Sequence, residues 1–72
     1  MNSFEIIERI KRLDYFLRSK CTGNSSELAK KLGVCRRTVF DDMDIIRSKG
    51  ADIYYSKISR TYYYQKEFKL IF

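Results

Sequence analysis

The chain is 72 residues long, enough for one small domain but for little of the core that a deep catalytic pocket needs. It has no His, the commonest general base and metal ligand, and two Cys alone cannot form a four-ligand zinc site, so no enzyme activity, metal or other cofactor is expected. Fifteen Lys and Arg against nine Asp and Glu give a net charge of +6, which is typical of a domain that binds a polyanion such as nucleic acid, although solubility alone also accounts for such a charge.

The first predicted element is an amphipathic helix over residues 4–19. Ser3 precedes it as a candidate N-cap, and apolar residues recur at three- and four-residue steps from Ile6 to Leu17. Its polar face pairs acids with bases four residues later, namely Glu5 with Arg9, Glu8 with Arg12 and Asp14 with Arg18. Because these charges cancel one another, the polar face is interpreted as solvated scaffold and not as a ligand site.

Two shorter helices are predicted next, over residues 25–32 and 36–48. Asn24 with Glu27 three residues later resembles a capping box, which favours a helix start. Gly33 supplies the left-handed position that commonly ends a helix. Two helices joined by a turn of three or four residues that contains Gly form a helix-turn-helix unit.

After Gly50 the hydrophobic period changes from 3.6 to 2, which predicts a β-hairpin over about 52–66. Two of the four residues in its connecting segment, 57–60, are positively charged. The many tyrosines of the strands are better explained by cross-strand packing than by stacking on nucleobases. The tail alternates well enough for a third strand over 68–72. No repeat or linker interrupts the chain, so a single domain is predicted over residues 1–72.

The whole pattern predicts an α+β winged helix-turn-helix, with three helices followed by a small antiparallel sheet or wing. In such a unit the second helix lies in the major groove of duplex DNA, and its N-terminal residues reach base edges. Here these residues are Arg36, Arg37 and Thr38. Arg can read guanine with two hydrogen bonds, whereas Thr can contact phosphate or a thymine methyl. Lys57 and Arg60 on the wing are expected to reach the backbone or the adjacent minor groove.

The run Glu27–Val34, the run Arg36–Phe40 and then Asp42 resemble the E-L-A-x-x-L-G-V-S-x-R-T-V-Y-x-D pattern of winged-helix domains of the DeoR/WYL type. The resemblance extends through the predicted hairpin and covers most of the chain. It implies sequence-specific binding of double-stranded DNA by a transcriptional regulator, with helix 36–48 in the major groove. The side chains that it implies to face the DNA are Arg36, Arg37, Thr38 and Phe40.

Three positions depart from the pattern of that family. Cys35 stands where a Ser usually caps the recognition helix, and because a thiol bonds weakly the helix start should be weaker. A redox role for this thiol is the less economical interpretation. Asp41 stands where a basic residue is common, and it could pair with Arg37, repel phosphate or accept a hydrogen bond from cytosine. The wing carries Ile58-Ser59-Arg60-Thr61 where the family often has a Gly-Gly-Tyr turn.

Simpler interpretations stand beside the functional ones. Arg36 and Arg37 could be a solvated helix start, although the helix dipole disfavours cations there. Lys57 and Arg60 could serve only to keep an edge strand from aggregating. The alternative function is a winged-helix module that binds protein and no DNA. This alternative is favoured by three acids predicted on the third helix: Asp41, Asp42 and Asp44.

No apolar run is long enough for a signal peptide or a membrane span, and two Cys are too few for the disulfide scaffold of a small secreted domain. We therefore expect a soluble cytoplasmic protein that touches no membrane. The tail Phe68–Phe72 should either pack on the first helix or form a homodimer interface. Domains of the DeoR/WYL type are mostly followed by a ligand-sensing domain, whereas this sequence stops at Phe72. No small-molecule effector is therefore expected within it.

Overall fold

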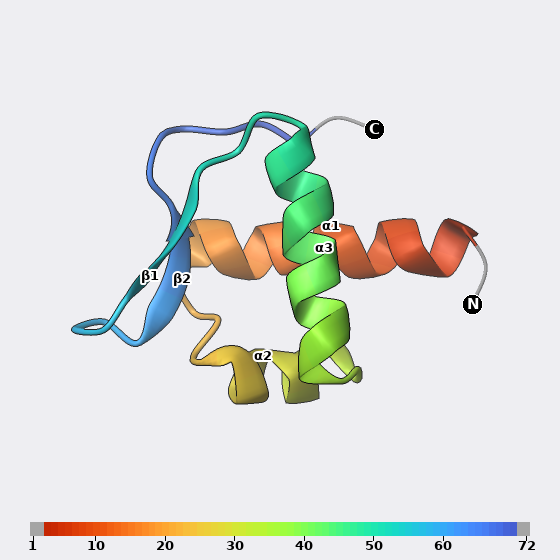
Figure 1. The fold of residues 1–72 in the computed structure, drawn as a ribbon, viewed down its shortest axis with the longest axis horizontal. Coiled ribbons are helices and arrows are strands. Elements are labelled where there is room, and N and C mark those ends of the chain that lie inside the picture. Colours follow the sequence, from red (N-terminus) through yellow and green to blue (C-terminus); the bar gives the residue numbers. More distant parts are fainter. Residues whose placement is uncertain (1–2, 71–72) are drawn as a thin grey trace.

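A computed structural model describes residues 3–70 and places three helices before a two-stranded antiparallel sheet (Figure 1). The helices are α1 (Ser3–Ser19), α2 (Ser25–Leu32) and α3 (Arg36–Ser48), and the strands are β1 (Ile53–Ser56) and β2 (Thr61–Tyr64). In the sheet, Ile53 lies opposite Tyr64 and Ser56 lies opposite Thr61. This order of elements confirms the predicted α+β winged helix-turn-helix fold.

The turn between α2 and α3 is built from local hydrogen bonds. At the start of α2, the Asn24 side chain accepts a hydrogen bond of 2.9 Å from the Glu27 amide, as the capping pattern predicted. At its end, Gly33 adopts a left-handed φ of 71°, which a residue without Cβ does at little cost. The next amide, of Val34, donates to the Ala29 carbonyl at 3.0 Å. The chain thereby reverses within a few residues and starts α3 against α2.

All three helices and the first strand contribute to one hydrophobic core. Its largest fully buried apolar side chains are Ile10, Leu13 and Leu17 of α1, Leu28 of α2, and Val39, Met43 and Ile46 of α3. Ile53 of β1 closes the core on the side of the sheet. Because α3 turns one face into this core, its opposite face is left on the surface.

An ion pair joins α1 to α3 at the edge of the core. Arg9 donates through Nη2 to Oδ1 of Asp42 at 2.9 Å and through Nε to Oδ2 of the same carboxylate. The Asp42 side chain is only 1% exposed, and its hydrogen bonds raise the pKa of Arg9 above the ordinary value. The interpretation of the α1 polar face as solvated scaffold is therefore wrong at Arg9, because this side chain turns toward α3.

The loop between α1 and α2 is tied to the wing by two buried threonines. The Thr22 amide donates to Oγ1 of Thr61 at 3.1 Å, and the two hydroxyls lie 3.0 Å apart. Oγ1 of Thr22 in turn accepts a 2.7 Å hydrogen bond from the Tyr62 amide. The hairpin is thus fixed to the loop between α1 and α2 by hydrogen bonds at the end of the strands that adjoins its turn.

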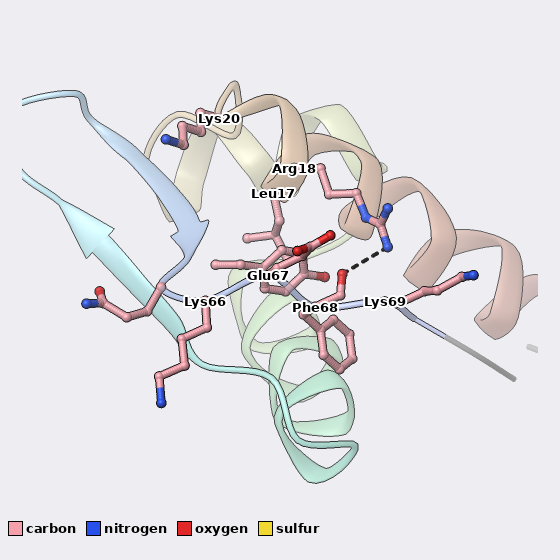
Figure 2. A pocket seen from close by; sticks show the side chains of 9 residues that line it. Leu17, Arg18, Lys20, Lys66, Glu67, Phe68 and Lys69 are labelled. Atoms are coloured by element: carbon pink, nitrogen blue, oxygen red, sulfur yellow. Dashed lines mark hydrogen bonds between the residues drawn. The ribbon is translucent and has the colours of Figure 1, made fainter.

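The third strand predicted over 68–72 is wrong for its described part, because residues 67–70 form no strand. The Phe68 carbonyl instead accepts a hydrogen bond of 3.0 Å from the side chain of Arg18 in α1 (Figure 2). In a sheet, this carbonyl would accept from the backbone of a neighbouring strand. Phe68 and Leu70 pack against the core, which is the first of the two alternatives expected for the tail. Phe72 lies outside the described residues.

The same end of α1 holds a second polar cluster. Arg18 pairs with Asp14 as the spacing predicted, at 3.0 Å, and the Tyr64 hydroxyl donates to Asp14 at 2.6 Å. Burial raises the pKa of Tyr64, and the neighbouring carboxylate raises it further. These contacts hold the end of β2 on α1, where the tail begins.

Candidate nucleic-acid interface

The first turn of α3 presents two guanidinium groups to solvent. Arg36 and Arg37 are both exposed, and none of the ion pairs found within residues 3–70 involves either of them. Arg36 donates through Nε to Oγ of Ser25 at 3.0 Å, which orients its side chain across the junction with α2. This end of α3 lies beside α2 in Figure 1. The structure therefore leaves Arg37 free to reach outward, whereas Arg36 is held at its base.

The exposed face of α3 is mixed in character. Phe40 and Ile45 are 39% and 38% exposed, so apolar surface accompanies the cations. Asp41 and Asp44 are exposed on the same helix, and Asp44 lies 3.4 Å from Arg47. Among the described residues no ion pair joins Asp41 to Arg37, so the first of the three roles considered for Asp41 is not formed in this structure.

Cys35 occupies the N-cap position of α3, and its side chain makes no capping hydrogen bond to the backbone. The absence of a side-chain cap agrees with the sequence, while the weaker helix start that should follow from it stays a prediction. The thiol instead lies 3.3 Å from the Thr38 hydroxyl. Hydrogen bonding to Thr38, from the side chain first and from the backbone second, lowers the pKa of the Cys35 thiol below its ordinary value.

Replacing Cys35 by Ser is expected to stabilise the domain, because a Ser hydroxyl in this position accepts a hydrogen bond from an amide of the first turn. We expect the melting temperature to rise by about 4–8 °C, the shift typical of one restored cap in a domain of this size. Circular dichroism during heating measures it. Cys21→Ser is the matched control, since Cys21 is also exposed and lies outside any helix. Equal melting of the two variants would contradict the capping argument.

The wing projects away from the helices, and its turn is the part of the hairpin most distant from them (Figure 1). Lys57 and Arg60 both lie in this turn and are exposed. Across the strands, the rings of Tyr55 and Tyr62 lie 4.8 Å apart, which confirms the interpretation of these aromatics as cross-strand packing. The two positive side chains therefore stand on a hairpin that its own aromatic contacts make rigid.

Sequence reasoning missed one cation beside the wing. Lys20, the residue that follows α1, lines a hollow of about 120 Å³ together with Ser56, Ser59 and Tyr63 of the hairpin. Its φ of 54° turns the chain sharply after the helix. Nothing near Lys20 in the sequence signals this position, because its neighbours in the hairpin follow more than thirty residues later.

An exposed, basic helix start braced by a preceding helix, together with a basic hairpin, defines a winged helix-turn-helix domain. A protein-family model described as an HTH domain matches residues 6–64, and the chain belongs to this helix-turn-helix family. The family is one of DNA-binding domains involved in transcription regulation, and its members are typically not enzymes. Neither a curated protein nor a solved structure gave a match. Within residues 3–70, no helix is long and apolar enough to cross a membrane.

Proposed function

We propose that the domain binds double-stranded DNA in a sequence-specific manner as a transcriptional regulator of the DeoR/WYL type. The observation that carries this proposal is the start of α3, where two exposed guanidinium groups stand together without a neutralising acid among the described residues. The positive end of the helix dipole adds to their charge. In the proposed complex α3 lies in the major groove, and the wing follows the adjacent backbone or minor groove.

The contacts of Arg36 and Arg37 support different roles for these two side chains. Arg37, which no described acid engages, reads a guanine edge with two hydrogen bonds. Arg36 is held by Ser25 through Nε, so its remaining donors reach a phosphate beside α2. Thr38 and Phe40 complete the groove contacts, with Phe40 packing on a thymine methyl.

The wing supplies contacts that do not depend on sequence. Lys57 and Arg60 are exposed and lie at the two ends of the four-residue turn, so both can neutralise phosphates of one duplex. Phe68 and Leu70 pack against the core and stay partly exposed, so a homodimer that reads two half-sites through the tail would use the part of these side chains that the core leaves uncovered.

The proposal is tested by fluorescence anisotropy of a labelled random-sequence duplex at 50 and 200 mM salt. We expect micromolar binding at the lower salt, weakened about a hundredfold at the higher salt if about four phosphates are contacted. The double variant Arg36→Ala with Arg37→Ala is the comparison, and it should bind more weakly at both salt concentrations. Absence of binding at 50 mM, or binding that salt leaves unchanged, would overturn the proposal.

The alternative function, a module that binds protein, is supported by fewer exposed acidic residues than the sequence suggested. Asp42 is buried against Arg9, and Asp44 lies beside Arg47. Of the three acids that favoured a protein partner, Asp41 alone remains exposed and outside the ion pairs of the described residues. Binding that resists salt would nevertheless point to this alternative.

A further inference from the structure

The tip of the wing carries an isoleucine that touches almost nothing. Ile58 is 97% exposed, whereas the next most exposed large apolar side chain of the described residues, Phe4, is 69% exposed. Turns favour Gly, Asn, Asp, Pro or Ser for conformational reasons that do not apply to isoleucine. Neither packing in the core nor turn geometry therefore explains an isoleucine at this position.

The backbone holds this side chain outward in a defined way. The Ser59 amide donates to Oγ of Ser56 at 3.1 Å, which closes the turn. Arg60 adopts a φ of 54°, in the left-handed region where Gly or Asn is favoured. Thr61, which follows Arg60 and lies opposite Ser56 in the strand pair nearest the turn, is fixed to the loop after α1 by its hydrogen bonds with Thr22. Ile58 thus lies at the tip of a turn whose backbone is held in place by hydrogen bonds.

The charges around the tip indicate what it would meet. Lys57 and Arg60 flank Ile58 in the turn, and Lys20 lies beside the base of the turn. No acidic residue occurs between Ile53 and Tyr64. An apolar tip among cations fits a polyanion that has an apolar interior, which is the nature of stacked bases between two phosphate backbones.

We propose that Ile58 is a wedge that enters the minor groove and partly unstacks one base step beside the site read by α3. The inference rests on the proposed function and adds a second source of specificity to it. Pyrimidine–purine steps, TA and CA/TG, are the easiest to unstack, so the wing prefers them through DNA deformability without a polar contact to any base.

The test is selection of binding sites from a random duplex pool by the parent protein, Ile58→Ser and Ile58→Leu. Because Ile58 is almost fully exposed, all three proteins should melt alike. We expect the parent and Ile58→Leu to select a shared motif plus a TA or CA/TG step at a fixed distance from it. Ile58→Ser should select the same motif without the step. In titrations, replacing the step should weaken the parent about tenfold and Ile58→Ser hardly at all.

The outcomes separate the inference from the function on which it rests. A shared motif with no step in the parent, or the same step in all three selections, would overturn the wedge and leave DNA binding intact. No motif in any selection would overturn sequence-specific binding and the wedge with it. Energy transfer between the ends of a selected duplex gives a second reading, in which the parent shortens the end-to-end distance and Ile58→Ser does not. A change in oligomeric state by Ile58→Ser, without an effect on DNA, would make this residue a protein contact and overturn the wedge.

Discussion

Replacing Asp42 by Ala is expected to destabilise the domain by about 3–5 kcal/mol, the typical cost of removing one partner from a buried ion pair, because both hydrogen bonds between Arg9 and Asp42 are lost. Arg9 is the remaining member of this pair, and its side chain is only 11% exposed. A loss of this size is a large share of the stability of a 72-residue domain, which is of the order of 0.1 kcal/mol per residue. Urea titration followed by circular dichroism measures the loss.

Two further variants make this result specific to the ion pair. Asp41→Ala removes an exposed acid one position away and should change the stability by less than about 0.5 kcal/mol. The double variant Arg9→Met with Asp42→Leu removes both charges and should recover most of the loss, because apolar side chains often replace a buried ion pair without penalty. If Asp42→Ala unfolds at the same urea concentration as Asp41→Ala, the pair contributes nothing to stability.

The Arg9–Asp42 pair shows where local sequence rules stop. The four-residue spacing assigned Arg9 to Glu5 on the same helix, and it gave no sign that Arg9 also binds Asp42, 33 positions away. Such a contact depends on how α1 crosses α3, and helix crossing is set by the packing of the core and not by either sequence segment alone. The same limit applies to Thr22 and Thr61, whose hydrogen bonds cannot be read from two isolated threonines.

The elements themselves could be predicted because each has a local cause. Asn24 caps the start of α2 and Gly33 caps its end, each through hydrogen bonds to residues a few positions away. The helix therefore occupies the predicted span. The tail has no such cause. Its alternation of apolar residues favoured a strand, but Arg18 binds the Phe68 carbonyl, and the apolar side chains pack on the core. A period of two reports burial on one side and does not require a strand partner.

In the candidate interface, too, some features could be predicted from the sequence and others could not. The placement of Arg36 and Arg37 at an exposed helix start followed from the spacing of the helix-turn-helix unit. The hydrogen bond of Arg36 to Ser25, the position of Lys20 beside the wing and the exposure of Ile58 needed the structure. Of these three features, only the exposure of Ile58 could have been suspected from the sequence, because an apolar residue is unusual inside a charged turn.

Arg37→Ala is expected to weaken binding to a selected site by about 1–3 kcal/mol and to relax the preference at one base pair, because a guanidinium on a guanine edge carries sequence information. Lys57→Ala should instead weaken all duplexes by a similar factor and reduce the slope of affinity against salt by about one unit, because a phosphate contact carries none. Titrations of the selected duplex and its single-base variants at several salt concentrations measure both effects.

The contrast between the two variants is what locates α3 in the groove. Lys11→Ala provides a control for loss of one positive charge, since Lys11 is exposed on α1 outside the proposed interface and should leave the base preference unchanged. Equal weakening of all sequences by Arg37→Ala would place Arg37 on phosphate, and base reading would then have to come from its neighbours on α3. A loss of preference confined to one base pair would fix the register of α3 on the DNA, because Arg37 stands one residue inside the start of that helix.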